Sequence, residues 1–305
     1  MPSTYDPFHE GERLAQELAG ERALADKHAV ILRGEIEPRA RPFLAEQRVL
    51  AAAVADADGA LWASLLAGEP GMARTTDGRG VELDLARIAQ VADDPFWRLA
   101  TPGADIGLLA IDLSHRRRLR INGRVTGRSE AAMHIEVRES YPNCPKYIEP
   151  REVSAAGRAS EGAGGADVAH GEALGDAQRR LVERTDTVFV ASRHSQRGAD
   201  ASHRGGPAGF VRVVAPRTLE IPDYAGNGMH NTLGNLLVEP RVGLVFLDFA
   251  GGRMLQVTGR AEVRFDQRDA PEPAAPRGAA TTRAWRVQVE RWLEAPLPLR
   301  AGLAG

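Results

Sequence analysis

Alternating apolar and polar positions in the second half of the chain predict β-strands. Along residues 254–261, Leu255 and Val257 alternate with Gln256 and Thr258, which is the two-residue period of a strand with one buried face. Residues 242–249 form an apolar run just before it, and the glycines at 251 and 252 supply the positive φ that a hairpin needs. This pattern predicts an antiparallel strand pair.

The first half carries a similar set of short apolar runs. Residues 48–55 and 61–66 flank an Asp-Gly turn, and residues 106–112 and 118–125 flank a tight polar connection. A later alternating strand follows in each half. Its apolar positions are Met133, Ile135 and Val137 in the first half and Trp285, Val287 and Val289 in the second.

These two sets are related by an internal duplication. Gly107, followed by Asp112, Arg117, Leu119, Ile121 and Gly123, recurs without a gap as Gly243, Asp248, Arg253, Leu255, Val257 and Gly259, an offset of 136 residues (107 to 243). Further upstream, Ala63-Ser64 recurs as Ala201-Ser202, an offset of 138 residues (63 to 201). Two matching blocks in the same order indicate that one structural unit is present twice.

Helical patterns are fewer. Residues 6–25 predict a charged helical arm, residues 93–99 and 231–238 predict short helices in equivalent places, and residues 176–184 predict another helix. Residues 269–282, rich in Pro and Ala, predict an excursion loop.

We therefore expect a mainly β protein with few helices, in which each half forms a small antiparallel barrel. Two such barrels in one chain would form a pseudo-dimer with an internal two-fold axis. The expected domains are a helical arm at 1–39, a first barrel half at 40–154, a Gly/Ala-rich linker at 155–175 and a second barrel half at 176–305.

Composition narrows the possible partners. With 39 basic and 41 acidic residues the net charge is −2, which disfavours nucleic acid as the main partner. The single cysteine, Cys144, excludes an internal disulfide and a cysteine-rich zinc site, and the spacing of His194, His203 and His230 indicates no metal site. The apolar runs are too short to span a membrane and the N-terminus shows no signal peptide, so we expect a cytoplasmic protein; a homodimer stays open.

Several motifs are similar to those of one known family. They are residues 200–206 (DASHRGG), 209–213 (GFVRV), 221–224 (IPDY), 226–236 (GNGMHNTLGNL), 240–243 (PRVG) and 255–261 (LQVTGRA), with 62–64 (WAS), 68–71 (GEPG), 116–123 (RRRLRING) and 143–148 (NCPKYI) in the first half. Over about residues 40–300 the chain resembles the pyridoxamine 5′-phosphate oxidase-like, FMN-binding split-barrel family, and within it the branch of predicted flavin-nucleotide-binding proteins. The resemblance implies a duplicated split barrel with FMN in a cleft between its two barrels.

The resemblance also suggests which residues hold FMN. Arg212 could bind the phosphate through its fork of donors, and Asn231 and Thr232 begin a helix whose free N–H groups favour an anion. Asn235 lies one turn further on the same face, and Gln256 could bind the pyrimidine edge of the flavin. Each has a plainer interpretation: a surface arginine, helix-capping residues, or a solvated strand residue.

Ser202 and Lys146 complete the expected cofactor-binding set. Lys146 could reach an anion held between the barrels, whereas Cys144 beside it is more typical of a small buried side chain than of a redox group. The basic residues at 116–118 and 120 are interpreted as a solvated hairpin tip, and Arg74 as an exposed turn residue. Related oxidases carry a basic pair where this chain has residues 229–232, and His230 would supply charge there only at lower pH.

The expected function is that of a flavin-dependent oxidoreductase acting on a small molecule or a redox partner. The cofactor carries the electron chemistry, and no catalytic residue can be named from the sequence. Two alternatives stay open: a non-catalytic flavin carrier, sensor or electron-transfer partner, and a split barrel that binds haem.

Overall fold

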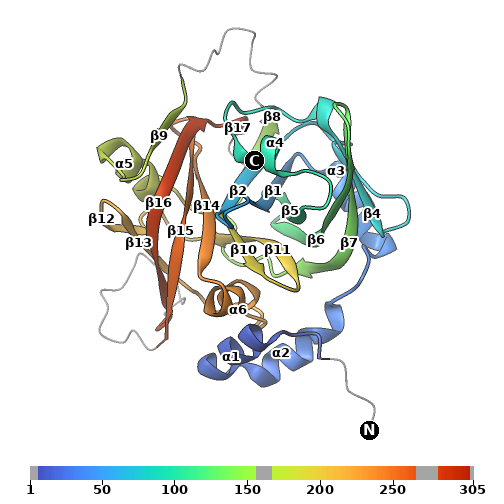
Figure 1. Cartoon of the computed structure of the whole chain (residues 1–305), viewed down its shortest axis with the longest axis horizontal. Coiled ribbons are helices and arrows are strands. Elements are labelled where there is room, and N and C mark those ends of the chain that lie inside the picture. The colour runs from blue at the N-terminus through green and yellow to red at the C-terminus, as the bar shows by residue number, and fades with distance from the viewer. Residues whose placement is uncertain (1–5, 156–166, 266–280, 303–305) are drawn as a thin grey trace.

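The computed structural model describes residues 6–155, 167–265 and 281–302. The first half forms a seven-stranded antiparallel sheet in the order β2-β1-β5-β6-β7-β4-β3 (Figure 1). Its strands are β1 (Val49–Ala55), β2 (Leu61–Ala67), β3 (Ala73–Arg74), β4 (Gly80–Asp84), β5 (Asp105–Asp112), β6 (Arg117–Arg128) and β7 (Ala132–Asn143).

The second half repeats this arrangement in the order β11-β10-β14-β15-β16-β13-β12. Its strands are β10 (Thr187–His194), β11 (Gly198–Gly205), β12 (Arg212–Ala215), β13 (Thr218–Pro222), β14 (Arg241–Asp248), β15 (Arg253–Arg264) and β16 (Ala284–Pro296). Each strand has a counterpart at the same place in the first sheet. The protein is therefore mainly β, with two similar sheets, as expected of a duplicated split barrel.

Helices are short and lie around the sheets. They are α1 (Glu10–Ala19), α2 (Arg22–His28), α3 (Arg41–Glu46), α4 (Pro95–Leu99), α5 (Asp176–Arg184) and α6 (Asn231–Val238), with 3₁₀ turns η1 (Ala29–Ile31), η2 (Pro38–Ala40) and η3 (Leu85–Arg87). No helix among the described residues is long and apolar enough to cross a membrane.

The two halves pack closely through equivalent glycines. A Cβ on Gly107 of β5 would lie 2.6 Å from the backbone nitrogen of Ala201, and a Cβ on Gly243 of β14 would lie 2.7 Å from that of Ala63. Gly107 and Gly243 are equivalent positions of the repeat, and so are Ala63 and Ala201. The two contacts are therefore related by the internal two-fold axis. Any side chain at either glycine would push the halves apart.

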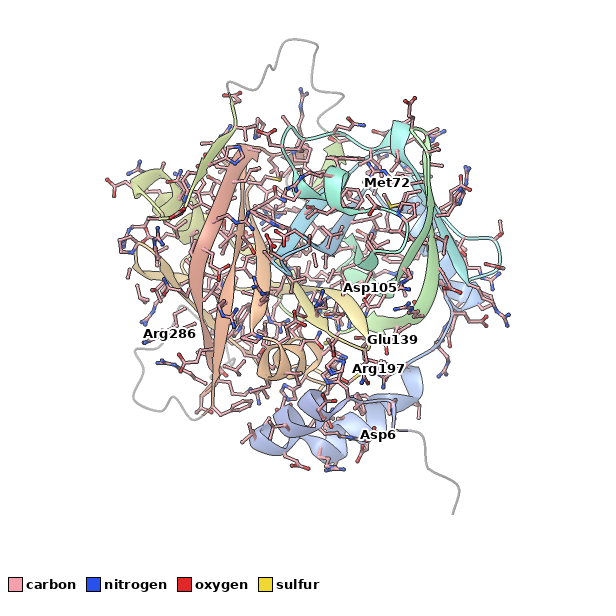
Figure 2. The ribbon with its side chains drawn as sticks, in the orientation of Figure 1. Asp6, Met72, Asp105, Glu139, Arg197 and Arg286 are labelled. Carbon is pink, nitrogen blue, oxygen red and sulfur yellow. The ribbon has the colours of Figure 1, made fainter. Side chains whose placement is uncertain are left out.

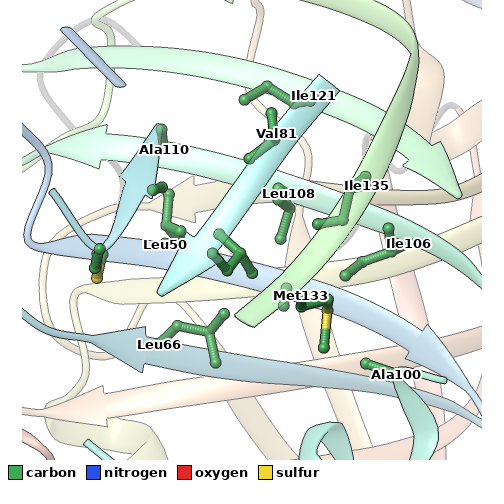
Figure 3. Close-up of a cluster of buried hydrophobic side chains, with 14 of the residues drawn as sticks. Leu50, Leu66, Val81, Ala100, Ile106, Leu108, Ala110, Ile121, Met133 and Ile135 are labelled. Atoms are coloured by element: carbon green, nitrogen blue, oxygen red, sulfur yellow. The ribbon is translucent and has the colours of Figure 1, made fainter. Parts of the chain in front are cut away.

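Apolar cores within each half and between the halves hold this arrangement together. One fills the first barrel around Leu50, Leu108 and Ile135 (Figure 3), and another fills the second barrel around Phe246 and Trp285. The third lies between the halves and is rich in small side chains; it includes Ala51, Ala53, Ala63, Ala191 and Ala201. Small residues let the strands of the two halves approach closely.

The arm expected as one helix over residues 6–25 is two helices. Gly20 adopts a left-handed φ of 69° and ends α1, which L-residues with side chains rarely do at low cost. In Figure 1, α1 and α2 lie beneath α6, and the helices meet at a glycine pair, since a Cβ on Gly11 would lie 2.2 Å from the carbonyl oxygen of Gly234.

Two pairings were not anticipated from the sequence. β9 (Ala169–Gly171), inside the segment expected to be a linker, pairs with β16, and β8 (Glu152–Ala155) pairs with β17 (Leu299–Gly302) from the far end of the chain. Residues 156–166 of the expected linker and most of the expected excursion loop lie outside the described residues.

Candidate anion-binding site

A small cavity of about 120 Å³ lies between the two halves. One wall comes from β6 and the end of β7 in the first half, and the other from β11, the loop after β13 and the start of α6 in the second. Its cationic lining residues are Arg118, Arg120, Lys146 and Arg204. Asp223 is the one carboxylate among the described lining residues, so the cavity favours an anion.

Three buried donors in this cavity have no hydrogen-bond partner within the described part of the chain. They are Nε of Arg118, Nε of Arg204 and Nε2 of His203. Arg118 donates from Nη1 to Nδ1 of His203 over 3.1 Å, and because arginine only donates, Nε2 of His203 carries the ring proton. Buried polar groups are rarely left unpaired, so three unsatisfied donors lining one cavity indicate a missing acceptor.

The remaining donors of the two arginines are fixed by the protein. Arg118 also donates from Nη2 to the carbonyl oxygen of Cys144. Arg204 donates from Nη1 to the carbonyl oxygen of His203 over 3.1 Å, and its Nη2 lies 3.5 Å from Asp223. These contacts orient both guanidinium groups before any ligand arrives.

The pKa values at this site reflect burial together with neighbouring positive charge. Burial, with Arg120 and Arg204 nearby, lowers the pKa of Arg118 to about 10. Burial and the same kind of neighbours, Arg118 and Arg204, hold the pKa of His203 well below its ordinary value, so the ring is neutral. A bound anion would offset the repulsion among the guanidinium groups.

The start of α6 forms part of the cavity wall. His230 precedes the helix with a left-handed φ of 59°, and the first N–H groups of a helix have no partner within it. The hydroxyls of Ser202 and Thr232 lie 2.9 Å apart and share a hydrogen bond that joins β11 to the helix. His230 is not a source of charge here: its Nε2 lies 2.9 Å from Glu21, and burial lowers its pKa.

Four of the seven residues expected to hold the cofactor meet at this cavity. Lys146, Asn231 and Thr232 line it, and Ser202 bonds to Thr232. Lys146 is exposed at the rim. Asn231 is already engaged, since it donates to Glu12 and accepts from Arg120 over 3.1 Å.

The structure places Arg212, Asn235 and Gln256 elsewhere. Arg212 lies on β12 and pairs with Glu220 over 2.5 Å on the neighbouring strand. Asn235 is buried and bonds to His9 over 3.0 Å and to Ser192 over 2.9 Å. Expected as a solvated or flavin-facing residue, Gln256 is fully buried between the halves.

Sequence reasoning missed the principal cations. Arg118 and Arg120 were interpreted as part of a solvated hairpin tip, which is wrong for Arg120: its side chain is 7% exposed and its Nε lies 3.2 Å from Asp200. The hairpin turn ends before them, and alternate positions of β6 share one face that meets the other half. Arg204 could have been found from its spacing, because it lies two residues after Ser202 on β11.

The duplication creates a counterpart to this site on the other side of the interface. The repeat pairs Arg120 with Gln256, and both make the same contact: Nε of Arg120 donates to the carbonyl oxygen of Ala201 over 3.1 Å, and Nε2 of Gln256 donates to that of Ala63 over 2.8 Å. At the counterpart, however, Met254 and Leu66 replace Arg118 and Arg204, and both are buried.

In that counterpart the acidic residue Asp94 stands where the first site has Thr232. Asp94 precedes α4 and accepts from Ser64 over 2.5 Å, as Thr232 bonds to Ser202 at the first site. Burial raises the pKa of Asp94 to about 6, which is expected where no cation is nearby. The counterpart is therefore unsuited to a phosphate.

Within the described ranges, one group of potential metal ligands is compact: His9, Glu10 and His194. The two imidazole rings stack with centroids 4.1 Å apart. Each ring nitrogen already has a hydrogen-bond partner, including backbone N–H groups of Gly11 and Gln196 at the two Nδ1 atoms. A donor aimed at Nδ1 leaves no lone pair for an ion there.

Several solved structures are similar, at low sequence identity, to about two fifths of this chain. No curated protein matches the chain. Among solved structures, HupZ of Group A Streptococcus is 13% identical over 39% of this chain and 91% of its own (TM-score 0.31), and a putative pyridoxamine 5′-phosphate oxidase from Lactobacillus delbrueckii is 16% identical over 41% and 98% (TM-score 0.32). An FAD-binding protein from Mesorhizobium loti is 14% identical over 42% and 97% (TM-score 0.28).

A family model gives the more specific result. The pyridoxamine 5′-phosphate oxidase model matches residues 174–295, a stretch that contains β10 to β15, most of β16 and helix α6. It includes Ser202, Arg204, Asn231 and Thr232 of the anion-binding site. The second half of this chain is thus similar to the pyridoxamine 5′-phosphate oxidase family, as its motifs indicated.

Proposed function

We propose that this chain is an FMN-binding flavoprotein that acts as an oxidoreductase on a small molecule. The observation that carries the proposal is the group of three unpartnered donors, from Arg118, Arg204 and His203, in a cationic cavity between two barrels. A phosphate group offers several strong acceptors and negative charge, which is the complement of this donor set.

The residues present fit the phosphate end of FMN. The cavity volume of about 120 Å³ is well below the roughly 300–1,000 Å³ of pockets that hold whole ligands. It suits a phosphate-sized group, so the ring system must lie in the open part of the cleft. Tyr147 and Tyr224, whose ring centroids are 5.2 Å apart, line the cavity together with Phe210.

In this proposal the protein binds and orients, and the flavin supplies electron or hydride transfer when bound. Arg118 and Arg204 hold the phosphate, and neutral His203 donates from Nε2. Lys146 adds charge at the rim, and the Ser202–Thr232 bond keeps the start of α6 in place. Electron chemistry on a flavin requires no protein acid or base, which agrees with the lack of an evident catalytic cluster among these residues.

The first test is FMN affinity. Apo-protein titrated with FMN and with riboflavin should prefer FMN, because riboflavin lacks the phosphate. We expect Arg204→Gln and Arg118→Gln each to weaken FMN binding about tenfold or more, since each removes a charge-assisted hydrogen bond worth about 1.5–3 kcal/mol, while riboflavin binding changes little.

Arg217→Gln is the matched control, because Arg217 is an exposed arginine of the same half that pairs with Glu172 over 2.6 Å. The proposal would be contradicted if the protein does not bind FMN, or if its absorption spectrum shows a Soret band instead of flavin bands. If the Arg204 and Arg118 variants lose affinity for FMN and for riboflavin equally, the substitutions have damaged the fold in general. The assignment of these arginines to the phosphate would then be wrong.

A second experiment separates an enzyme from a carrier or sensor. The flavin-loaded protein is reduced without oxygen by NADH or NADPH and then mixed with a trial acceptor. Repeated cycles of reduction and reoxidation support an oxidoreductase. If the flavin stays bound but is not reduced and reoxidised with any donor tried, the result supports a non-catalytic flavin carrier or sensor.

A further inference from the structure

A second and larger cavity, of about 590 Å³, lies under the N-terminal arm. The arm forms one wall, between Pro7 and Gly34; the first half contributes β6 and β7, and the second contributes β11 and α6. We call it the arm chamber. Its volume lies within the range of small-molecule sites, and Asn231 alone lines both this chamber and the anion-binding cavity.

Hydrogen-bond acceptors characterise the chamber. Three carboxylates line it, from Glu12, Glu139 and Asp200. Asp200 is 3% exposed, and its Oδ1 accepts from Asn122 over 3.1 Å while its Oδ2 has no partner among the described residues. Oδ1 of Asn122, which is 8% exposed, is likewise unpartnered. Two buried, unsatisfied acceptors on one cavity wall indicate a missing donor.

The cations around the chamber offset the charge of these carboxylates only in part, because the pKa values of Glu12 and Glu139 stay raised although Arg197 acts to lower both. Arg120 pairs with the occupied oxygen of Asp200. Arg33 and Arg138 are exposed and pair with acids that do not line the chamber, Glu37 over 3.2 Å and Asp105 over 3.0 Å.

Two further titratable groups lie on the wall. Arg197 donates to the carbonyl oxygen of Pro7 over 3.0 Å. Figure 2 labels it close to Glu139, whose pKa Arg120 and Arg197 both act to lower. Burial lowers the pKa of His9 to about 4, so this histidine adds no charge at neutral pH.

The carboxylates also influence each other. Burial, with Glu139 and Asp200 nearby, raises the pKa of Glu12 to about 8. Burial and Asp200 raise the pKa of Glu139. A positive charge placed between them would offset both effects.

A single metal ion does not suit these acceptors. The compact group of potential metal ligands in the described part of the chain contains His9, Glu10 and His194, and none of the three carboxylates. Their oxygens are therefore too far apart to surround one ion, and the volume is that of an organic molecule.

We propose that the arm chamber binds a small organic cation with several N–H donors, such as an alkyl diamine, between Asp200, Asn122 and Glu139. One amino group would donate to Oδ2 of Asp200 and Oδ1 of Asn122, and the other end would reach Glu139. The site is distinct from the anion-binding cavity, and the proposal does not depend on flavin binding.

The probe is 1,4-diaminobutane, titrated calorimetrically into the full chain, with 1,4-butanediol as a neutral molecule of the same length. We expect saturable binding of the diamine and none of the diol. Binding should tighten between about pH 7 and pH 8.5, as Glu12 loses its proton.

Two variants test the site. Asp200→Asn and Glu139→Gln should each weaken diamine binding at least tenfold. Glu136→Gln is the matched control, because Glu136 is exposed on the same strand, β7, and does not line the chamber. If the buried Asp200→Asn variant does not fold, the diamine affinity of Glu139→Gln tests the proposal.

No binding by the native chain, or equal binding by Glu139→Gln and Glu136→Gln, would overturn the proposal. FMN affinity measured on Glu139→Gln separates the two proposals, because we expect it to match the native value. Loss of diamine binding with FMN binding intact shows two independent sites.

Discussion

Two arginines of the second half show how little the local sequence says about a residue's role. Arg204 and Arg212 are both half-buried and both lie within strands or at their start. Arg204 lies on β11 and lines the cavity between the halves together with Arg118 and His203. Arg212 lies on the edge strand β12, where Glu220 satisfies it, and Glu220 also accepts from Arg286 over 2.9 Å.

At this scale we predict that Arg212→Gln changes FMN affinity less than twofold. The side chain is 29% exposed and its charge is already neutralised by Glu220, so stability should change by no more than about 1 kcal/mol. Fluorescence titration of FMN and thermal unfolding measure both effects. A tenfold loss of FMN affinity in this variant would contradict the prediction and show that Arg212 contributes to phosphate binding.

Helix α1 shows how one element joins distant parts of the chain. Its capping box links His9 and Glu12, since Glu12 accepts from the backbone N–H of His9 over 2.9 Å. The same carboxylate accepts from Asn231 at the start of α6. The arm is therefore fixed to the second half by a buried acid as well as by the glycine contact.

Glu12 gives the arm a pH dependence. Its pKa rises from 4.5 to about 8 on folding, so between these values the folded chain keeps a proton that the unfolded chain releases, and this group lowers stability as pH rises. We expect the stability of Glu12→Gln, relative to the native chain, to increase from about pH 5 to about pH 8, by up to roughly 1.4 kcal/mol per pH unit.

Thermal unfolding at several pH values measures the difference in stability between Glu12→Gln and the native chain. The test is the change of this difference with pH, so its sign at the lowest pH does not matter. Glu17→Gln, at an exposed position of the same helix, should show a constant difference over the same range. A constant difference for Glu12→Gln would mean that this carboxyl group titrates normally.

On the scale of the whole molecule, the duplicated sheets have kept their strand order but not equivalent interface sites. Both sites retain the contact to an alanine carbonyl across the interface, made by Arg120 in one and Gln256 in the other. Only one has cations and unpartnered donors. The other is closed by Met254 and Leu66 and contains Asp94.

We therefore predict one FMN per chain at saturation. Flavin absorbance against protein concentration, together with the mass of the intact complex, measures the ratio. Arg204→Gln should lower the fraction of protein that holds FMN when FMN is limiting, and the titration should show no second class of FMN site. A ratio of two, with equal affinities, would show that the counterpart binds as well.

The periodic pattern of the sequence was sufficient for most of the local structure. Alternation at residues 254–261 corresponds to β15, the strand expected at residues 118–125 lies within β6, and the helices at 176–184 and 231–238 have the expected bounds. The repeat offsets of 136 and 138 residues indicated two similar units, and the two sheets have the same strand order. These features depend on neighbours along the chain, whose side chains define the buried face of each element.

Other features depend on contacts between distant residues. The β8–β17 pair, the docking of Gly107 against Ala201, and the meeting of Arg118 with His203 each join positions more than 80 residues apart. The sequence determined a duplicated β protein with a phosphate-compatible helix start at Asn231. Only the tertiary structure decided which arginines face the interface, because a strand's alternation separates its two faces but does not say what covers each of them.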